Sequence, residues 1–286
     1  MDNQYRLDKL KIRKSFDRAA DTYDASAMLQ QEVAKRLVER LDYIRQQPNT
    51  VLDLGCGTGN ITSSMIARYP KANILALDLS YNMLKKTKKQ GGWFSKKPLC
   101  ICADAENLPL KKNSVDLLIS SLMLQWSNDI HATFRGFRRV ISPNGLLMFT
   151  TFGPDTLKEI RASWAMVDNK PHTSQFTDMH DIGDALLAAG FSNPVMDMEM
   201  MTVTYESVRE LMRDIKNIGA SNATEGRSKG LMGKQRLADF EAAYEDFIDN
   251  KGLYPTTWEV IYGHAWVPEK MQMDDFKKVI PIQSVN

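Results

Sequence analysis

The chain has 286 residues, of which 43% are hydrophobic and 25% charged, and its formal net charge is +2. These values are typical of a globular protein with one large or two small domains. They give no electrostatic case for nucleic acid, and no run approaches the ~20 apolar residues of a membrane span. The three cysteines and four histidines show no metal or disulfide spacing, so we expect a cytoplasmic protein without a metal.

The first 46 residues are predicted to be helical. Leu29, Val33 and Leu37 recur at helical spacing within residues 28–45, which predicts an amphipathic helix. Phe16 and Tyr23 lie seven residues apart and share a face if the first helix is continuous.

Residues 51–60, VLDLGCGTGN, combine a short apolar strand, a glycine turn and the start of a helix. This order predicts a nucleotide-binding turn, because alternate glycines let the backbone approach a ligand closely. The spacing is G-x-G-x-G. Asn60 stands where a dinucleotide fingerprint has its third glycine, and Asp53 precedes the loop by two residues.

Acidic residues follow the next two apolar runs. Asp78 ends the run 74–79 and lies about 20 residues after the loop, where a ribose-binding acid is expected. Asp104 and Glu106 follow the short run around Ile101. Alternation of strands and helices predicts parallel crossovers, so these acids are expected at one edge of the sheet.

A fourth apolar run, residues 115–124, ends in Gln125 and Trp126. Ligands of open α/β sheets bind at the carboxyl ends of the strands. We therefore expect these two side chains to face the site where substrate and cofactor meet.

Two further strands are predicted at 146–152 and 194–205, and the last at 256–267. About 50 residues separate the last two strands, which is long for one connection and suggests a lid. We expect a single domain over 1–267, made of N-terminal helices (1–46), a core (47–204), an inserted helical lid (205–252) and a final strand (253–267). Residues 268–286 are expected to be a poorly ordered tail.

The glycine loop, Asp53 and the later acids together resemble the class I S-adenosylmethionine (SAM) methyltransferases. More specific segments are FDRAADTYD at 16–24, LQW at 124–126 and LMRDIKNIGASNATEGRSKGL at 211–231. With them, roughly residues 12–267 resemble the malonyl-acyl carrier protein O-methyltransferases, the BioC family of biotin synthesis. The resemblance implies an α/β Rossmann-like fold with a mostly parallel seven-stranded sheet, helices on both faces and an inserted helical lid.

The resemblance also implies methyl transfer from SAM to the free carboxylate of malonyl-acyl carrier protein, whose malonyl group is carried on phosphopantetheine. The product is the methyl ester primer of biotin synthesis, and no metal, nucleic acid or membrane takes part. The expected SAM-binding residues are Tyr23, Asp53, Gly55, Cys56, Gly57, Gly59, Asp78, Leu79, Met83, Asp104, Ala105 and Glu106.

A carboxylate acceptor is already ionised at pH 7, so no residue is expected to be essential as a base. A desolvated carboxylate needs a cation or hydrogen-bond donors. The candidate substrate-binding residues are Gln125, Trp126, Arg209, Arg213, Lys216 and Arg227.

Three alternatives remain open at this stage. One is another class I methyltransferase that acts on a small molecule, such as a quinone precursor. The second is a non-methylating relative, such as the assembly-factor arginine hydroxylases. The third, an NAD dehydrogenase, is disfavoured by Asn60 and by the acids at 53 and 104.

Overall fold

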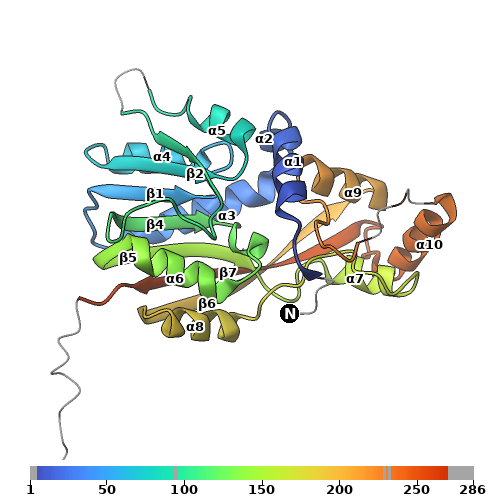
Figure 1. Cartoon of the computed structure of the whole chain (residues 1–286). Helices are drawn as coiled ribbons and strands as arrows, with labels where there is room; N and C mark the ends of the chain where they lie inside the picture. The colour runs from blue at the N-terminus through green and yellow to red at the C-terminus, as the bar shows by residue number, and fades with distance from the viewer. Residues whose placement is uncertain (1–4, 93–95, 228–229, 231–232, 270–286) are drawn as a thin grey trace, which may run out of the picture.

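The computed structural model describes residues 5–92, 96–227, 230 and 233–269. Within them the strands form one seven-stranded sheet in the order β3-β2-β1-β4-β5-β7-β6 (Figure 1). Strands β1 to β5 are mutually parallel, and β7 runs antiparallel between β5 and β6. The predicted fold class is confirmed. The strands are β1 (Thr50–Leu54), β2 (Asn73–Asp78), β3 (Leu99–Cys102), β4 (Val115–Ser121), β5 (Ile141–Phe152), β6 (Ser192–Tyr205) and β7 (Tyr254–Trp266).

Helices cover both faces of this sheet (Figure 1). The α-helices of the described residues are α1 (Lys9–Ala19), α2 (Tyr23–Ser26), α3 (Met28–Glu39), α4 (Asn60–Arg68), α5 (Tyr81–Thr87), α6 (Ile130–Val140), α7 (Lys158–Ala165), α8 (Met179–Ala188), α9 (Val208–Asn217) and α10 (Lys234–Tyr244). Short 3-10 helices are η2 (Arg40–Tyr43), η3 (Leu124–Trp126) and η4 (Glu245–Phe247).

The apolar strands explain why the sheet is covered twice. Successive residues of a strand point to opposite faces, so a continuous apolar run needs a helix layer on each side. Val51 and Leu117 pack in one cluster with residues of α3 and α4. Their neighbours Leu52 and Leu118 pack in a second cluster with residues of α6 and α8.

The segment between β6 and β7 leaves and rejoins the sheet at one point, since Tyr205 pairs with Tyr254. Its helices are α9 and α10, which lie near α7 at one end of the molecule (Figure 1). Leu211 of α9 and Phe240 of α10 are fully buried and belong to the same cluster as Trp164 and Trp258. The inserted helices are therefore packed against the core.

Residues 6–9, here called the N-terminal strap, run beside the inserted segment. The amide of Asp8 donates to the carbonyl of Ala223 (2.9 Å), and the amide of Glu225 donates to the carbonyl of Arg6 (2.8 Å). Leu7 and Thr224 form an isolated antiparallel bridge between these bonds. The strap thus joins the beginning of the chain to a segment far along the sequence.

Several element ends differ from the sequence expectations. β5 begins at Ile141 because this residue pairs with Val115 ahead of an irregularity in the β4–β5 ladder. Helix α7 begins only at Lys158, after a left-handed Leu157 (φ 58°). Of the expected tail, residues 270–286 lie outside the described residues.

Gly263 offers a test of the packing between β5 and β7. A Cβ there would lie 2.7 Å from Cε1 of Phe149 and 2.9 Å from Sδ of Met196. We expect Gly263→Ala to lower the free energy of unfolding by ~1–3 kcal/mol, because overpacking forces side chains off their rotamers. Gly183→Ala is the matched control. It lies in α8 with nothing within 4 Å of the new Cβ, and should raise stability by ~0.5–1 kcal/mol. Urea unfolding measures the free energy of unfolding of both variants. An equal change in the two would contradict the packing described here for Gly263.

Candidate active site

The loop between β1 and α4 depends on three glycines. Gly55, Gly57 and Gly59 have φ angles of +74°, +54° and +95°, a region that side-chain-bearing residues rarely adopt. A Cβ at Gly55 would also lie 2.7 Å from the side chain of Met123. The left-handed backbone of this loop therefore favours glycine, and of the three glycines Gly55 lines one of the two cavities described below, whereas Gly57 and Gly59 line neither.

Asp78, at the end of β2, fixes this loop. Its Oδ2 accepts a hydrogen bond from the amide of Gly57 (2.9 Å), and its Oδ1 accepts one from the amide of Ser80 (2.7 Å). Burial raises the pKa of Asp78 to about 6. Because both oxygens accept backbone N–H groups, the ionised form is the one that this arrangement favours.

Cys56, within the loop, and Asp53 and Met83, outside it, line neither of the two cavities described below. The Asp53 carboxylate accepts a hydrogen bond from the hydroxyl of Thr62, which ties β1 to α4. Burial raises its pKa to about 7. Cys56 and Met83 are also buried, and contact of these three residues with the cofactor stays a prediction.

A small cavity of about 60 Å³ opens beside the loop. It brings together most of the acids and small residues that the sequence picks out at the carboxyl ends of β1, β2 and β3. Its lining includes Gly55, Asp78, Leu79, Asp104, Ala105 and Glu106. Residues distant in sequence are collected here because parallel strands all end at the same edge.

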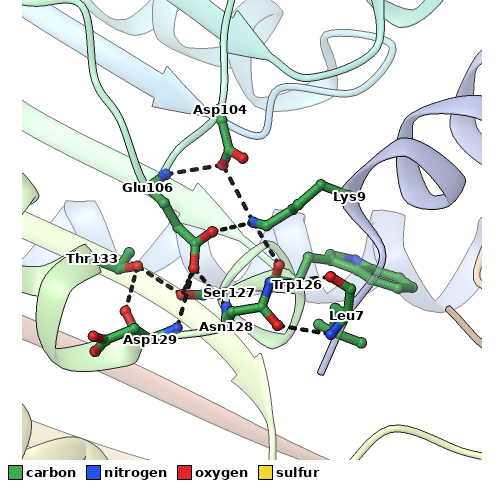
Figure 2. A network of polar contacts seen from close by, with 9 residues as sticks. All are labelled: Leu7, Lys9, Asp104, Glu106, Trp126, Ser127, Asn128, Asp129 and Thr133. Atoms are coloured by element: carbon green, nitrogen blue, oxygen red, sulfur yellow. Dashed lines mark hydrogen bonds and ion pairs between the residues drawn. The ribbon is translucent and has the colours of Figure 1, made fainter. Parts of the chain in front are cut away.

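Lys9 also lines this cavity, and sequence reasoning missed it. Its Nζ lies 3.3 Å from Oδ1 of Asp104 and 2.7 Å from Oε2 of Glu106, and donates to the carbonyl of Trp126 at 3.0 Å (Figure 2). Figure 2 also shows Leu7 of the strap bonded to the side chain of Asn128. These contacts hold the strap beside the cavity. No local sequence pattern predicts them, because their partners lie far along the chain.

The two acids in this network have different surroundings. Burial alone would raise the pKa of Glu106, but Lys9 and the amides of Asn128 and Asp129 outweigh it, and the pKa is lowered. Oδ1 of Asp104 accepts from the amide of Glu106 (3.0 Å) as well as from Lys9. Within the described part of the chain, Oδ2 of Asp104 has no hydrogen-bond partner and remains free to accept one.

A second, larger cavity of about 370 Å³ lies next to the first. Tyr23 and Gln125 line it, together with many apolar and aromatic residues from α1, β5, α7, α9, β7 and the segment between α7 and α8. Among them are Phe16, Phe152, Trp164, Phe176, Met212 and Trp258. Burial raises the pKa of the Tyr23 hydroxyl, and the charge of Asp78 raises it further. Of the described residues, Trp126 is the one that lines both cavities, so it marks the place where they meet.

The charged side chains that line the larger cavity are all basic among its described residues. Four basic side chains contribute to it, and no Asp or Glu is found among its described lining residues. The four are Lys11, Lys216, Arg227 and Arg236. Arg236 forms an ion pair with Asp168, whose Oδ1 also accepts a hydrogen bond from Nε2 of His172 at 2.9 Å. The imbalance of charge makes this cavity suited to an anionic ligand.

Arg209 and Arg213 do not reach this cavity. Arg209 forms an ion pair with Glu241 of α10 (2.6 Å), and its side chain is 69% exposed. Arg213 is exposed and lines neither cavity. The structure therefore brings together Lys216 and Arg227 of the predicted cations, and adds Lys11 and Arg236, which the sequence did not single out.

Comparison with known proteins bears directly on this geometry. Residues 52–149 match the model of a methyltransferase domain family. The chain is 49% identical to the malonyl-acyl carrier protein O-methyltransferase of Gallionella capsiferriformans, covering 93% of each chain. It is 48% identical to the protein of the same name from Laribacter hongkongensis, covering 98% of this chain and 97% of that one.

This chain belongs to the malonyl-acyl carrier protein O-methyltransferase family. It is a SAM-dependent methyltransferase, and the family membership weighs against the NAD dehydrogenase alternative. No helix within the described residues is long and apolar enough to cross a membrane. In the same residues, no group of three or more His, Cys, Asp or Glu side chains could hold a metal.

Solved structures show the fold of this methyltransferase in more distant proteins. The YcgJ protein from Bacillus subtilis aligns with a TM-score of 0.59 at 13% identity, covering 84% of this chain and 99% of that one. The [4+2]-cyclase SpnF aligns with a TM-score of 0.52 at 19% identity, covering 84% and 82%. At such identities the likeness concerns the fold alone, and a cyclase among the matches shows that this fold does not fix the chemistry.

Asp78 is the residue on which we expect SAM binding in this methyltransferase to depend most. Asp78→Ala removes a buried acceptor that holds Gly57 and faces the cavity, at a cost of ~1–3 kcal/mol, which corresponds to a ~10- to 100-fold weaker affinity. Titration calorimetry with SAM measures this. Asp42→Ala, at an exposed ion pair with Arg68, is the control. Unchanged affinity in Asp78→Ala would refute the assignment.

Proposed function

We propose that this protein transfers the methyl group of SAM to the free carboxylate of the malonyl group on acyl carrier protein. The methyl ester formed is the primer for the pimeloyl chain of biotin. The observation that carries this proposal is the junction at Trp126 between an acid-lined small cavity and a larger cavity lined by cations. The names of the relatives at 48% and 49% identity support the same substrate.

The smaller cavity has the features that SAM requires. Asp78 can accept the ribose hydroxyls, and the open Oδ2 of Asp104 can accept the adenine amino group. The positive φ angles of the loop give the amino-acid part of SAM access to the backbone. We therefore propose that the twelve SAM residues expected from the sequence act together. Gly55, Asp78, Leu79, Asp104, Ala105 and Glu106 make contact from the cavity wall. Gly57, Gly59, Asp53, Cys56 and Met83 shape the loop, and Tyr23 closes the side toward the larger cavity.

SAM, when bound, supplies a methyl group on a sulfonium, which is a strong electrophile. The acceptor carboxylate is ionised at pH 7, so the protein has no proton to remove. The chain's own contribution is to hold the acceptor beside Trp126 and to exclude water. No residue is expected to act as a general base.

The acceptor carboxylate loses its hydration when it enters the cavity, so the cavity must supply cations or hydrogen-bond donors in place of water. An unpaired carboxylate in an apolar cavity is costly, whereas one that is paired and hydrogen-bonded is tolerated. Lys216 and Arg227 are the predicted cations that reach the cavity. The guanidinium of Arg227 suits this task because its planar fork can bind a carboxylate at two points.

The remaining walls fit the rest of the substrate. Phosphopantetheine is a long, largely uncharged arm, and the aromatic and aliphatic lining of the larger cavity can surround it. Met212, Ile215 and Ile218 of the inserted segment contribute to this lining. We propose that residues 205–252 act as a lid that closes over the arm, while the acyl carrier protein itself stays outside.

Methylation of malonyl-acyl carrier protein by the purified protein tests this function. We expect one S-adenosylhomocysteine for each malonyl group methylated, and no methyl transfer to acetyl-acyl carrier protein, which lacks the carboxylate. The measurement follows S-adenosylhomocysteine formation and the mass of the carrier protein. Methylation of a small-molecule acceptor, with malonyl-acyl carrier protein left unchanged, would point to the alternative class I methyltransferase.

A further inference from the structure

The four cations of the larger cavity differ in what surrounds them. Arg236 is neutralised by Asp168, and Lys216 is exposed at the end of α9. Lys11 and Arg227 are different, because both lie against the first turn of α1. They lie far apart in the sequence and are brought together by the N-terminal strap.

Asp8 is the residue that joins them. As the N-cap of α1, its Oδ1 accepts a hydrogen bond from the amide of Lys11 at 3.0 Å. Its Oδ2 accepts one from Nη2 of Arg227 at 3.3 Å, while Nη1 of Arg227 donates to the carbonyl of Thr224 at 2.7 Å. The Arg227 side chain is only 16% exposed. The guanidinium is therefore held in one position at the cavity wall.

The charges at this point do not balance. Asp8 offers one negative charge to Arg227, and in the part of the chain that the structure describes, Nζ of Lys11 has no hydrogen-bond or ion-pair partner. Desolvation and the neighbouring Arg227 charge lower the pKa of Lys11. A wall of the cavity thus carries an excess positive charge that a ligand anion can neutralise.

The position of this charge relative to Trp126 is also defined. Phe16, which follows Lys11 on α1, lies edge-on to the Trp126 ring with centroids 5.4 Å apart. Both aromatic residues line the larger cavity together with Lys11 and Arg227. The cationic wall therefore belongs to the same cavity as the residue that marks the junction with the cofactor site.

We propose that Lys11 and Arg227 together form the subsite that binds the malonyl carboxylate, and that Asp8 is a positioning residue that holds Arg227. This inference rests on the proposed function and names the groups that select its substrate. An acyl group without the carboxylate leaves the two cations unpaired, so the same pair favours malonyl over neutral acyl groups.

The test compares Lys11→Met with the wild type in the methylation of malonyl-acyl carrier protein. We expect kcat/KM to fall about 10- to 100-fold, as for loss of a hydrogen bond to a charged group. The affinity for SAM and the inhibition constant of acetyl-acyl carrier protein should stay unchanged, because neither ligand presents a carboxylate to Lys11. The Asp8 cap bonds the backbone amide of residue 11, so the variant keeps this contact, and a thermal melt checks its fold.

Two further variants complete the test. Lys14→Met removes an exposed cation from the same helix and should leave kcat/KM unchanged, whereas Lys11→Arg should restore most of the activity. Near-normal kcat/KM in Lys11→Met would overturn the inference, as would an equal loss of acetyl-acyl carrier protein binding, which indicates a structural role. A wild-type protein that does not methylate malonyl-acyl carrier protein would overturn the proposed function itself, and the inference with it.

Discussion

Two adjacent residues of the N-terminal strap contact side chains that line the two cavities. Lys9 forms ion pairs with Asp104 and Glu106 beside the glycine loop, and Asp8 forms one with Arg227 at the wall of the larger cavity. Since the strap also hydrogen-bonds residues 223 and 225, it joins the core to the inserted segment. Both cavities therefore depend on the same short piece of backbone, and a shift of the strap would alter the two together.

The two cavities differ in the charged groups that line them. The small cavity presents carboxylates at its rim, which can accept the hydroxyl and amino hydrogens of a nucleoside. The large cavity presents cations and, within its described lining, no acid. Such a separation matches a reaction between a nucleoside-bearing methyl donor and an anionic acceptor. Trp126 lies at the boundary between the two cavities.

The local part of this arrangement could be predicted from the sequence. The apolar runs predict the sheet, and the glycine spacing predicts the loop, because both depend on neighbouring residues. The placement of Asp78 and Asp104 follows from a rule of parallel sheets, that ligands gather at the carboxyl ends of strands.

The cations were harder to predict. Arg209 lies two turns of α9 away from Lys216, and there Glu241 of α10 neutralises it. Nothing near Arg209 in the sequence indicates that partner, which comes from another helix. Lys9 and Lys11 resemble ordinary solvent-facing charges of an amphipathic helix, and they line the cavities because α1 folds back over the core. Tertiary contacts of this kind leave no periodic signal.

The most direct measurement is a crystal structure with S-adenosylhomocysteine and malonyl-pantetheine amide, an analogue that resists hydrolysis. The account predicts S-adenosylhomocysteine at Asp78 and Asp104, and the malonyl carboxylate between Lys11 and Arg227, with one oxygen facing the sulfur beside Trp126. A carboxylate found at Arg209 or Arg213, or outside the larger cavity, would contradict it.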